Sequence, residues 1–108
     1  MNDQHVIEEV KLLITEMQRL GSPNADGNIS VKFGALFADD RCANIFEALI
    51  GTLRAAKKRK VVDFKGQMLF QGVHDNVDIV LIDDSFQGWD ELLGGKIYTL
   101  PLLYYDVE

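Results

Sequence analysis

The sequence predicts an α+β domain of winged-helix type: three helices, then a β-hairpin wing, then a C-terminal extension. Apolar side chains recur at helical spacing through the first part of the chain, and after residue 60 the period changes to the two-residue period of strands. An apolar and acidic stretch then continues over residues 83–108. A helix, a short strand, two helices and a hairpin, in that order, are typical of winged-helix domains.

The first helix is expected to begin at Asp3, which can cap it, and to end before Gly21, a common residue at helix C-termini. Charged residues occupy the positions between its apolar ones. The expected buried face consists of Ile7, Val10, Leu13, Ile14, Met17 and Leu20.

Residues 28–30 are expected to add a short strand edge, after which Ser30 can cap a second helix over residues 31–38. Asp39 and Asp40 then precede a third helix, predicted over residues 41–58, and their charge suits its N-terminus. The expected apolar face of the third helix consists of Ile45, Phe46, Leu49, Ile50, Leu53 and Ala56.

The wing is predicted from three strand-like segments. Residues 61–64 form the first, Lys65 and Gly66 a tight turn, residues 68–71 the second strand and residues 77–82 the third. These elements delimit one domain over residues 1–82, followed by the extension over residues 83–108.

Charge is distributed unevenly along the chain. Residues 1–82 hold ten Lys or Arg and eleven Asp or Glu, a net charge of −1, whereas residues 83–108 hold one basic and six acidic residues, a net charge of −5. A single cysteine, Cys42, allows no internal disulfide, and the N-terminus lacks the basic and apolar regions of a secretory signal. No apolar run is long enough to span a bilayer. The cytoplasm is therefore the expected compartment.

Motifs for metals, nucleotides and catalysis are incomplete. The loop over residues 22–33 resembles a calcium-binding loop but has Phe33 where a bidentate Glu is needed. The Gly-Gly-Lys at residues 94–96 lacks the spacing of a phosphate loop. His5, His74 and Cys42 are too few and too scattered for zinc, and no motif orients a Cys42–His74 catalytic pair. We expect no metal, no cofactor and no enzymatic activity.

A basic run closes the third helix and is the candidate binding patch. It can be a solvated helix end that balances the helix dipole, or a contact for an acidic protein partner. In a winged helix it can also contact nucleic acid, which is the alternative function, but the near-neutral domain argues against that partner. The run consists of Lys57, Lys58, Arg59 and Lys60.

From Gly21 to Ile79 the chain resembles the costars family, small proteins also found as the C-terminal domain of the striated-muscle activator of Rho signalling. The similarity lies in many short segments that follow one another in one register. They are residues 21–22, 24–27, 30–34, 36–37, 39–40, 42–44, 46–49, 51–53, 55–60, 72–75 and 77–79.

The resemblance implies a winged-helix-like fold and a non-enzymatic role in actin organisation and cell motility. The implied partner is actin or an actin-regulatory protein, bound by a monomer that is cytoplasmic and cytoskeleton-associated. The resemblance supplies no fixed functional motif, and we expect the contact surface at the basic run 57–60 together with Arg54 and Lys32.

The extension is too apolar to be only a solvated tail, since it contains Phe86, Trp89 and the run over residues 97–105. We expect it to pack on the domain, with an added strand around residues 96–100; a partner-binding segment is the alternative. If its negative charge competes for the basic run, deleting residues 83–108 should strengthen partner binding.

Overall fold

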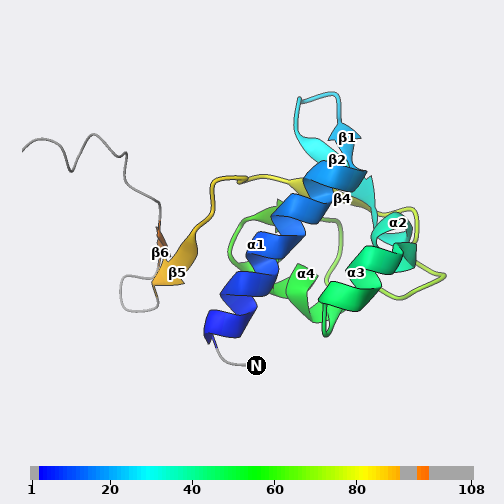
Figure 1. Cartoon of the computed structure of the whole chain (residues 1–108). Helices are drawn as coiled ribbons and strands as arrows, with labels where there is room; N and C mark the ends of the chain where they lie inside the picture. Colours follow the sequence, from blue (N-terminus) through cyan, green and yellow to red (C-terminus); the bar gives the residue numbers. More distant parts are fainter. Residues whose placement is uncertain (1–2, 91–94, 98–108) are drawn as a thin grey trace, which may run out of the picture.

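The computed structural model describes residues 3–90 and 95–97, and within them the α+β class is confirmed. The described part contains four helices, a four-stranded antiparallel sheet and a small two-stranded sheet (Figure 1). The helices are α1 (Asp3–Leu20), α2 (Phe33–Ala38), α3 (Asp40–Ile45) and α4 (Leu49–Lys58). The strands are β1 (Ser22–Pro23), β2 (Ile29–Lys32), β3 (Val62–Asp63), β4 (Asp78–Leu81), β5 (Gly88–Asp90) and β6 (Gly95–Ile97).

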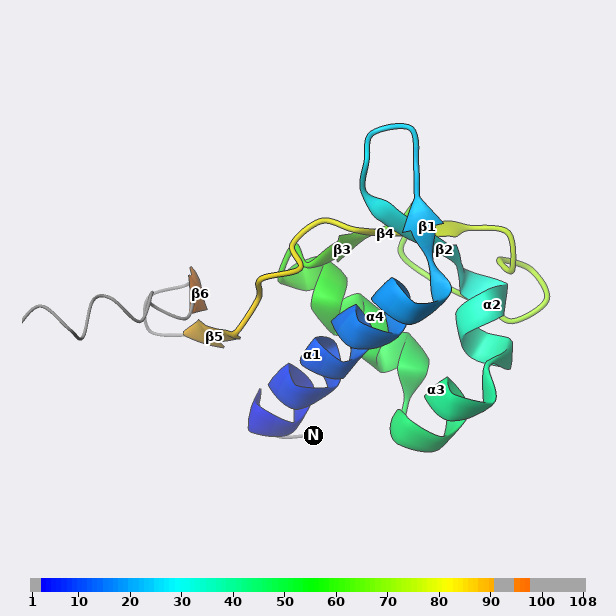
Figure 2. The same cartoon turned by 45° about the horizontal axis from the view of Figure 1, so that its top comes forward.

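The larger sheet has the order β1-β2-β4-β3, so β4 is paired on both sides. Val31 of β2 lies opposite Ile79 of β4, and Val62 of β3 lies opposite Leu81. Helix α1 packs against α4 and against β2, and α2 packs against α3 (Figure 2). The sheet and the helices therefore share one core, as expected for a domain of this size.

The apolar periodicity of the first helix is confirmed by burial. Val10, Leu13 and Met17 are fully buried, and they meet Phe33, Leu53 and Ile79 from other elements. Gly21 follows the helix, and its N–H donates to the carbonyl oxygen of Met17, so the helix ends where the sequence indicated. None of the described helices combines the length and the apolar character that crossing a membrane requires.

The single helix predicted over residues 41–58 is wrong, because the chain breaks it into α3 and α4. Phe46 has extended backbone angles (φ −100°, ψ 125°) and its ring is buried in the core. The carboxylate of Glu9, on α1, accepts hydrogen bonds from the Glu47 N–H at 3.2 Å and from the Thr52 hydroxyl at 2.6 Å. The carboxylate, distant in sequence, thus satisfies a backbone N–H group at the break between the two helices. Local periodicity could not reveal this contact.

The second helix was also predicted to begin too early. Ser30 pairs with Val80 in the sheet instead of capping a helix, and β2 continues to Lys32. Helix α2 begins at Phe33, whose N–H donates to the carbonyl oxygen of Val77. Hydrogen bonds to β4 thus take precedence over the capping preference of Ser30.

The predicted wing is corrected in its second strand. Residues 68–71 form no strand; β3 pairs directly with β4, and residues 64–77 connect the two. Leu69 is buried and anchors this connection, while the Phe70 N–H donates to His74 Nδ1 at 2.8 Å. The third predicted segment, residues 77–82, corresponds to β4.

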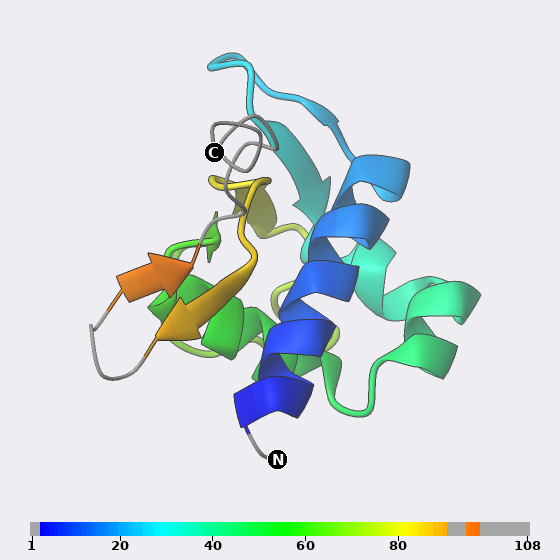
Figure 3. The ribbon, with the colours of Figure 1, turned by 60° about the vertical axis from the view of Figure 1, so that its left-hand side comes forward.

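The extension starts with a residue of the core, since Phe86 is fully buried among the apolar side chains of the domain. Beyond it, β5 pairs with β6, which Figure 3 brings to the front of the view. The strand expected around residues 96–100 overlaps β6 at residues 96–97, and residues 98–100 lie outside the described part of the chain.

A basic groove as candidate functional site

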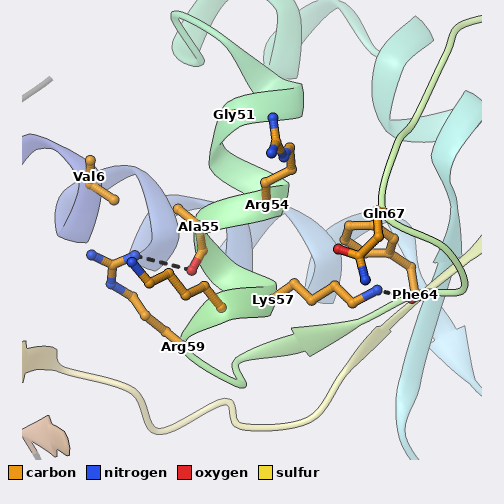
Figure 4. A pocket seen from close by; sticks show the side chains of 9 residues that line it. Val6, Gly51, Arg54, Ala55, Lys57, Arg59, Phe64 and Gln67 are labelled. Carbon is orange, nitrogen blue, oxygen red and sulfur yellow. Dashed lines mark hydrogen bonds between the residues drawn. The ribbon is translucent and has the colours of Figure 1, made fainter. Parts of the chain in front are cut away.

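A groove of about 580 Å³ crosses the outer face of α4 (Figure 4). One wall is the first part of α1, and the other is the loop that follows β3. Among the residues that the structure describes, no acidic side chain lines the groove, although the whole chain has a net charge of −6. The lining residues are Val6, Gly51, Arg54, Ala55, Lys57, Lys58, Arg59, Phe64 and Gln67.

Lys57 holds the far wall of the groove in place. Its Nζ donates to the carbonyl oxygens of Phe64 and Gly66, and it lies 4.3 Å from the centroid of the Phe64 ring. A cation over an aromatic face adds to these hydrogen bonds. In Figure 4 the Lys57 side chain points along the groove toward Phe64 and Gln67. Lys57 therefore positions the loop over residues 64–67, and its charge is already engaged within the fold.

Arg59 is also used by the fold. Its side chain is buried, and Nη1 donates to the Ala55 carbonyl oxygen at 3.2 Å. The same carbonyl oxygen accepts from the Arg59 backbone N–H at 3.2 Å, so the side chain adds a second hydrogen bond in the last turn of α4. Arg59 thus contributes positive charge at the groove margin, but its guanidinium is largely withdrawn from solvent.

Lys60 terminates the helix by a Schellman motif. Its φ is +61°, its N–H donates to the Lys57 carbonyl oxygen, and the Val61 N–H donates to the Ala56 carbonyl oxygen. This pattern is usually built on glycine, because other residues adopt a positive φ only at some cost. Lys60 is exposed but does not line the groove.

Arg54 and Lys58 are the exposed cations of the groove. Both lie on α4, one turn apart, and both side chains are exposed. Gly51 and Ala55 form the neighbouring stripe of the helix, so small residues hollow the surface beside the two cations. This geometry suits a partner that places negative groups on the two cations and an apolar group beside them.

Lys32 lies at a different place. Its Nζ forms an ion pair with Asp78 at 2.8 Å and donates to the Asn76 carbonyl oxygen at 3.2 Å. It lines a separate hollow beside Pro23 and Ala35. Of the six residues predicted as contacts, the structure brings Arg54, Lys57, Lys58 and Arg59 into one groove, and it places Lys60 and Lys32 outside that groove.

The neutral lining residues were missed by the sequence reasoning. Val6 and Phe64 are distant from α4 in sequence, and only the fold brings them to its two sides. Gly51 did carry a signal, since glycine within a helix is unfavourable.

Within the described part of the chain, two groups of His, Cys, Asp and Glu side chains come close enough to hold a metal ion. His5, Glu9 and Glu47 form one group, in which the His5 Nε2 lies 3.4 Å from Glu9 and 3.3 Å from Glu47. The buried Glu9 carboxylate already accepts the two hydrogen bonds described above. Contacts within the protein therefore account for the close approach of these three side chains without a metal ion.

The second group surrounds the start of α3. Arg19 bridges Glu16 and Asp39, and Asp39 caps α3 by accepting from the Cys42 N–H at 2.9 Å. The hydrogen bond from Arg19, then that from the Cys42 backbone, lowers the pKa of Asp39 to about 2. Burial, followed by the neighbouring Asp39, raises the pKa of the Cys42 thiol to about 11. A thiol with such a pKa stays protonated and unreactive at neutral pH.

Comparisons with known proteins give matches over most of the chain. The family model described as Costars matches residues 5–82. Costars family protein ABRACL is 67% identical over 84 residues in Salmo salar, 66% in Mus musculus and 63% in Homo sapiens; each match covers 78% of this chain and 100% of the relative. The solution structure of human HSPC280 protein matches with a TM-score of 0.67 at 62% identity, covering 78% of this chain and 95% of that one.

Proposed function

This chain belongs to the costars family, and from that premise we propose that it is a small non-enzymatic regulator of actin organisation and cell motility. Its partner is actin or an actin-regulatory protein, which it binds as a monomer in the cytoplasm, in association with the cytoskeleton. The observation that carries the proposal is the basic groove across α4, since it offers a contact surface of one charge on an otherwise acidic chain.

A protein partner suits this groove better than nucleic acid. Lys57 and Arg59 donate to carbonyl oxygens of the fold, and Lys32 is paired with Asp78. Within the described lining, Arg54 and Lys58 are left as the exposed cations, too few for the phosphate contacts that dominate nucleic-acid affinity. Apolar groove walls, by contrast, are typical of surfaces that receive side chains of another protein.

Co-sedimentation of the purified protein with actin filaments tests this function. Direct binding predicts that the protein pellets with filaments and stays in the supernatant without them. Action through another regulator predicts no pelleting, but a change in the rate of actin assembly once that regulator is added. A protein that neither pellets nor alters assembly, alone or with a cell extract, would contradict the proposal.

A further inference from the structure

We infer that the groove is a docking site for an acidic protein segment, one that places an apolar side chain over Gly51 and Ala55 and two carboxylates against the neighbouring Arg54 and Lys58. The inference rests on the proposed function, because it states the chemistry of the partner that the same groove would take. It is independent of whether actin itself supplies the segment.

Gly51 supports a close approach of the partner at this point. It is the third residue of α4, its φ is in the ordinary helical range, and it is exposed. A Cβ built there would meet only the Ala48 Cβ, at 3.8 Å, which is ordinary contact. Neither the backbone nor the packing of the described chain therefore requires glycine, although alanine would favour the helix. A partner that comes close to the α4 backbone would require it.

The two cations beside this hollow set the chemistry. Arg54 and Lys58 are four residues apart, about 6 Å along the helix axis. Two carboxylates separated by one turn of a helix match that spacing, and so do carboxylates two residues apart in an extended segment. Both would meet favourable charge, because the described lining contains no acidic residue. Charge complementarity of this kind selects acidic segments over neutral ones.

The apolar part of the groove completes the match. Val6 from α1, Ala55 from α4 and Phe64 from the loop after β3 bring apolar surface from three separate elements to one hollow. The volume of about 580 Å³ is within the range that takes several side chains of a ligand. Lys57 fixes Phe64 through the carbonyl contacts and the ring contact, so this wall is formed before a partner arrives.

A labelled peptide tests the inference with the full-length protein. The probe is a 15-residue helical peptide with glutamates four residues apart and a leucine one turn further on the same face. Its control has glutamine in place of both glutamates. In fluorescence anisotropy we expect the acidic peptide to bind with a Kd below about 1 mM and the glutamine peptide to bind at least about threefold more weakly.

Matched variants locate the contact. Arg54→Glu and Lys58→Glu should each weaken peptide binding about threefold to tenfold. Lys65→Glu makes the same change of charge at an exposed position just outside the groove and should leave binding within about twofold. Gly51→Ala should weaken binding although its melting temperature does not fall.

Three results would overturn the inference: no binding of the acidic peptide, equal binding of the glutamine peptide, or equal losses in Lys65→Glu and in the groove variants. Tighter binding of a single-stranded oligonucleotide than of the acidic peptide would overturn it as well. Failure of the actin assays with intact peptide binding would instead count against the proposed function alone, which keeps the two ideas separable.

Discussion

The Glu9 carboxylate accepts a hydrogen bond of 2.6 Å from the Thr52 hydroxyl inside the protein, joining α1 to the beginning of α4. The other oxygen of the same carboxylate accepts from the Glu47 N–H, in the segment between α3 and α4. Val6 lies one turn before Glu9 on α1 and forms a wall of the basic groove. The buried carboxylate therefore fixes both the break in the chain and the spacing of the groove.

Removing this carboxylate should destabilise the domain. Glu9→Leu leaves the Glu47 N–H without its acceptor and leaves the Thr52 hydroxyl with the Ala48 carbonyl oxygen at 3.2 Å, and we expect it to lower the free energy of unfolding by about 2–3 kcal/mol. Urea denaturation followed by circular dichroism measures this. Glu8→Leu, at an exposed position of the same helix, is the control and should change stability by less than about 0.5 kcal/mol. Similar losses in the two variants would contradict the assignment.

Asp39 should make stability depend on pH in the acid range. Its pKa is about 2 in the folded protein, below the usual value, because Arg19 and the Cys42 N–H favour the carboxylate. The stabilisation is therefore complete above about pH 4 and is lost as the pH falls toward about 2. Asp39→Asn should show a smaller fall in melting temperature between about pH 5 and pH 2 than the wild type. Parallel curves would show that Asp39 does not cause the dependence.

Lys60 offers a stabilising substitution. Its positive φ is one that glycine adopts freely, so Lys60→Gly should raise the free energy of unfolding by about 0.5–1 kcal/mol. Lys60→Ala removes the same charge but retains the Cβ, and it should not give this gain. Thermal unfolding of the two variants beside the wild type distinguishes the backbone effect from the loss of charge. An equal gain in stability for Lys60→Ala and Lys60→Gly would contradict the claim that the positive φ of Lys60 costs stability.

The C-terminal extension should be tested without disturbing Phe86, which is part of the core. Deleting residues 91–108 removes three acidic residues and Lys96, a net charge of −2, and keeps this anchor. If the extension competes for the groove, the deletion should strengthen partner binding by about twofold to tenfold. Glu91→Gln, Asp106→Asn and Glu108→Gln combined then test whether charge alone is responsible. If both variants bind the partner as the wild type does, the extension does not compete with the partner for the groove.

The elements that sequence reasoning located are those whose residues act locally. The spacing of Val10, Leu13 and Met17 predicts α1, and Asp39 is found at the start of α3 as a cap. The break at residues 46–48 depends on Glu9, and the start of α2 depends on hydrogen bonds with β4. Such long-range contacts override the preference of the local sequence for helix, and the spacing of apolar residues does not indicate them.

The positive charge of the groove could be predicted from the sequence, but its walls and the hydrogen bonds of its cations could not. The basic run and Arg54 indicate a positive surface at the end of α4. Only the fold shows that Lys57 and Arg59 donate to carbonyl oxygens, and only the fold places Val6 and Phe64 on either side of the helix. A substitution of all four basic residues in the run would therefore disturb folding and binding together, whereas Arg54 and Lys58 can be changed with less risk.

Co-sedimentation with actin filaments of the wild type, Arg54→Glu, Lys58→Glu and Lys65→Glu tests the central claim most directly. The account predicts that the wild type and Lys65→Glu pellet alike, and that each groove variant pellets with at least about threefold lower affinity while its melting temperature is unchanged. If none of the four proteins pellets, the same four are compared in the actin-assembly assay with the added regulator. Equal pelleting of all four proteins, or equal effects of all four on that assembly, would contradict the claim that the groove across α4 is the surface through which this chain reaches the actin cytoskeleton.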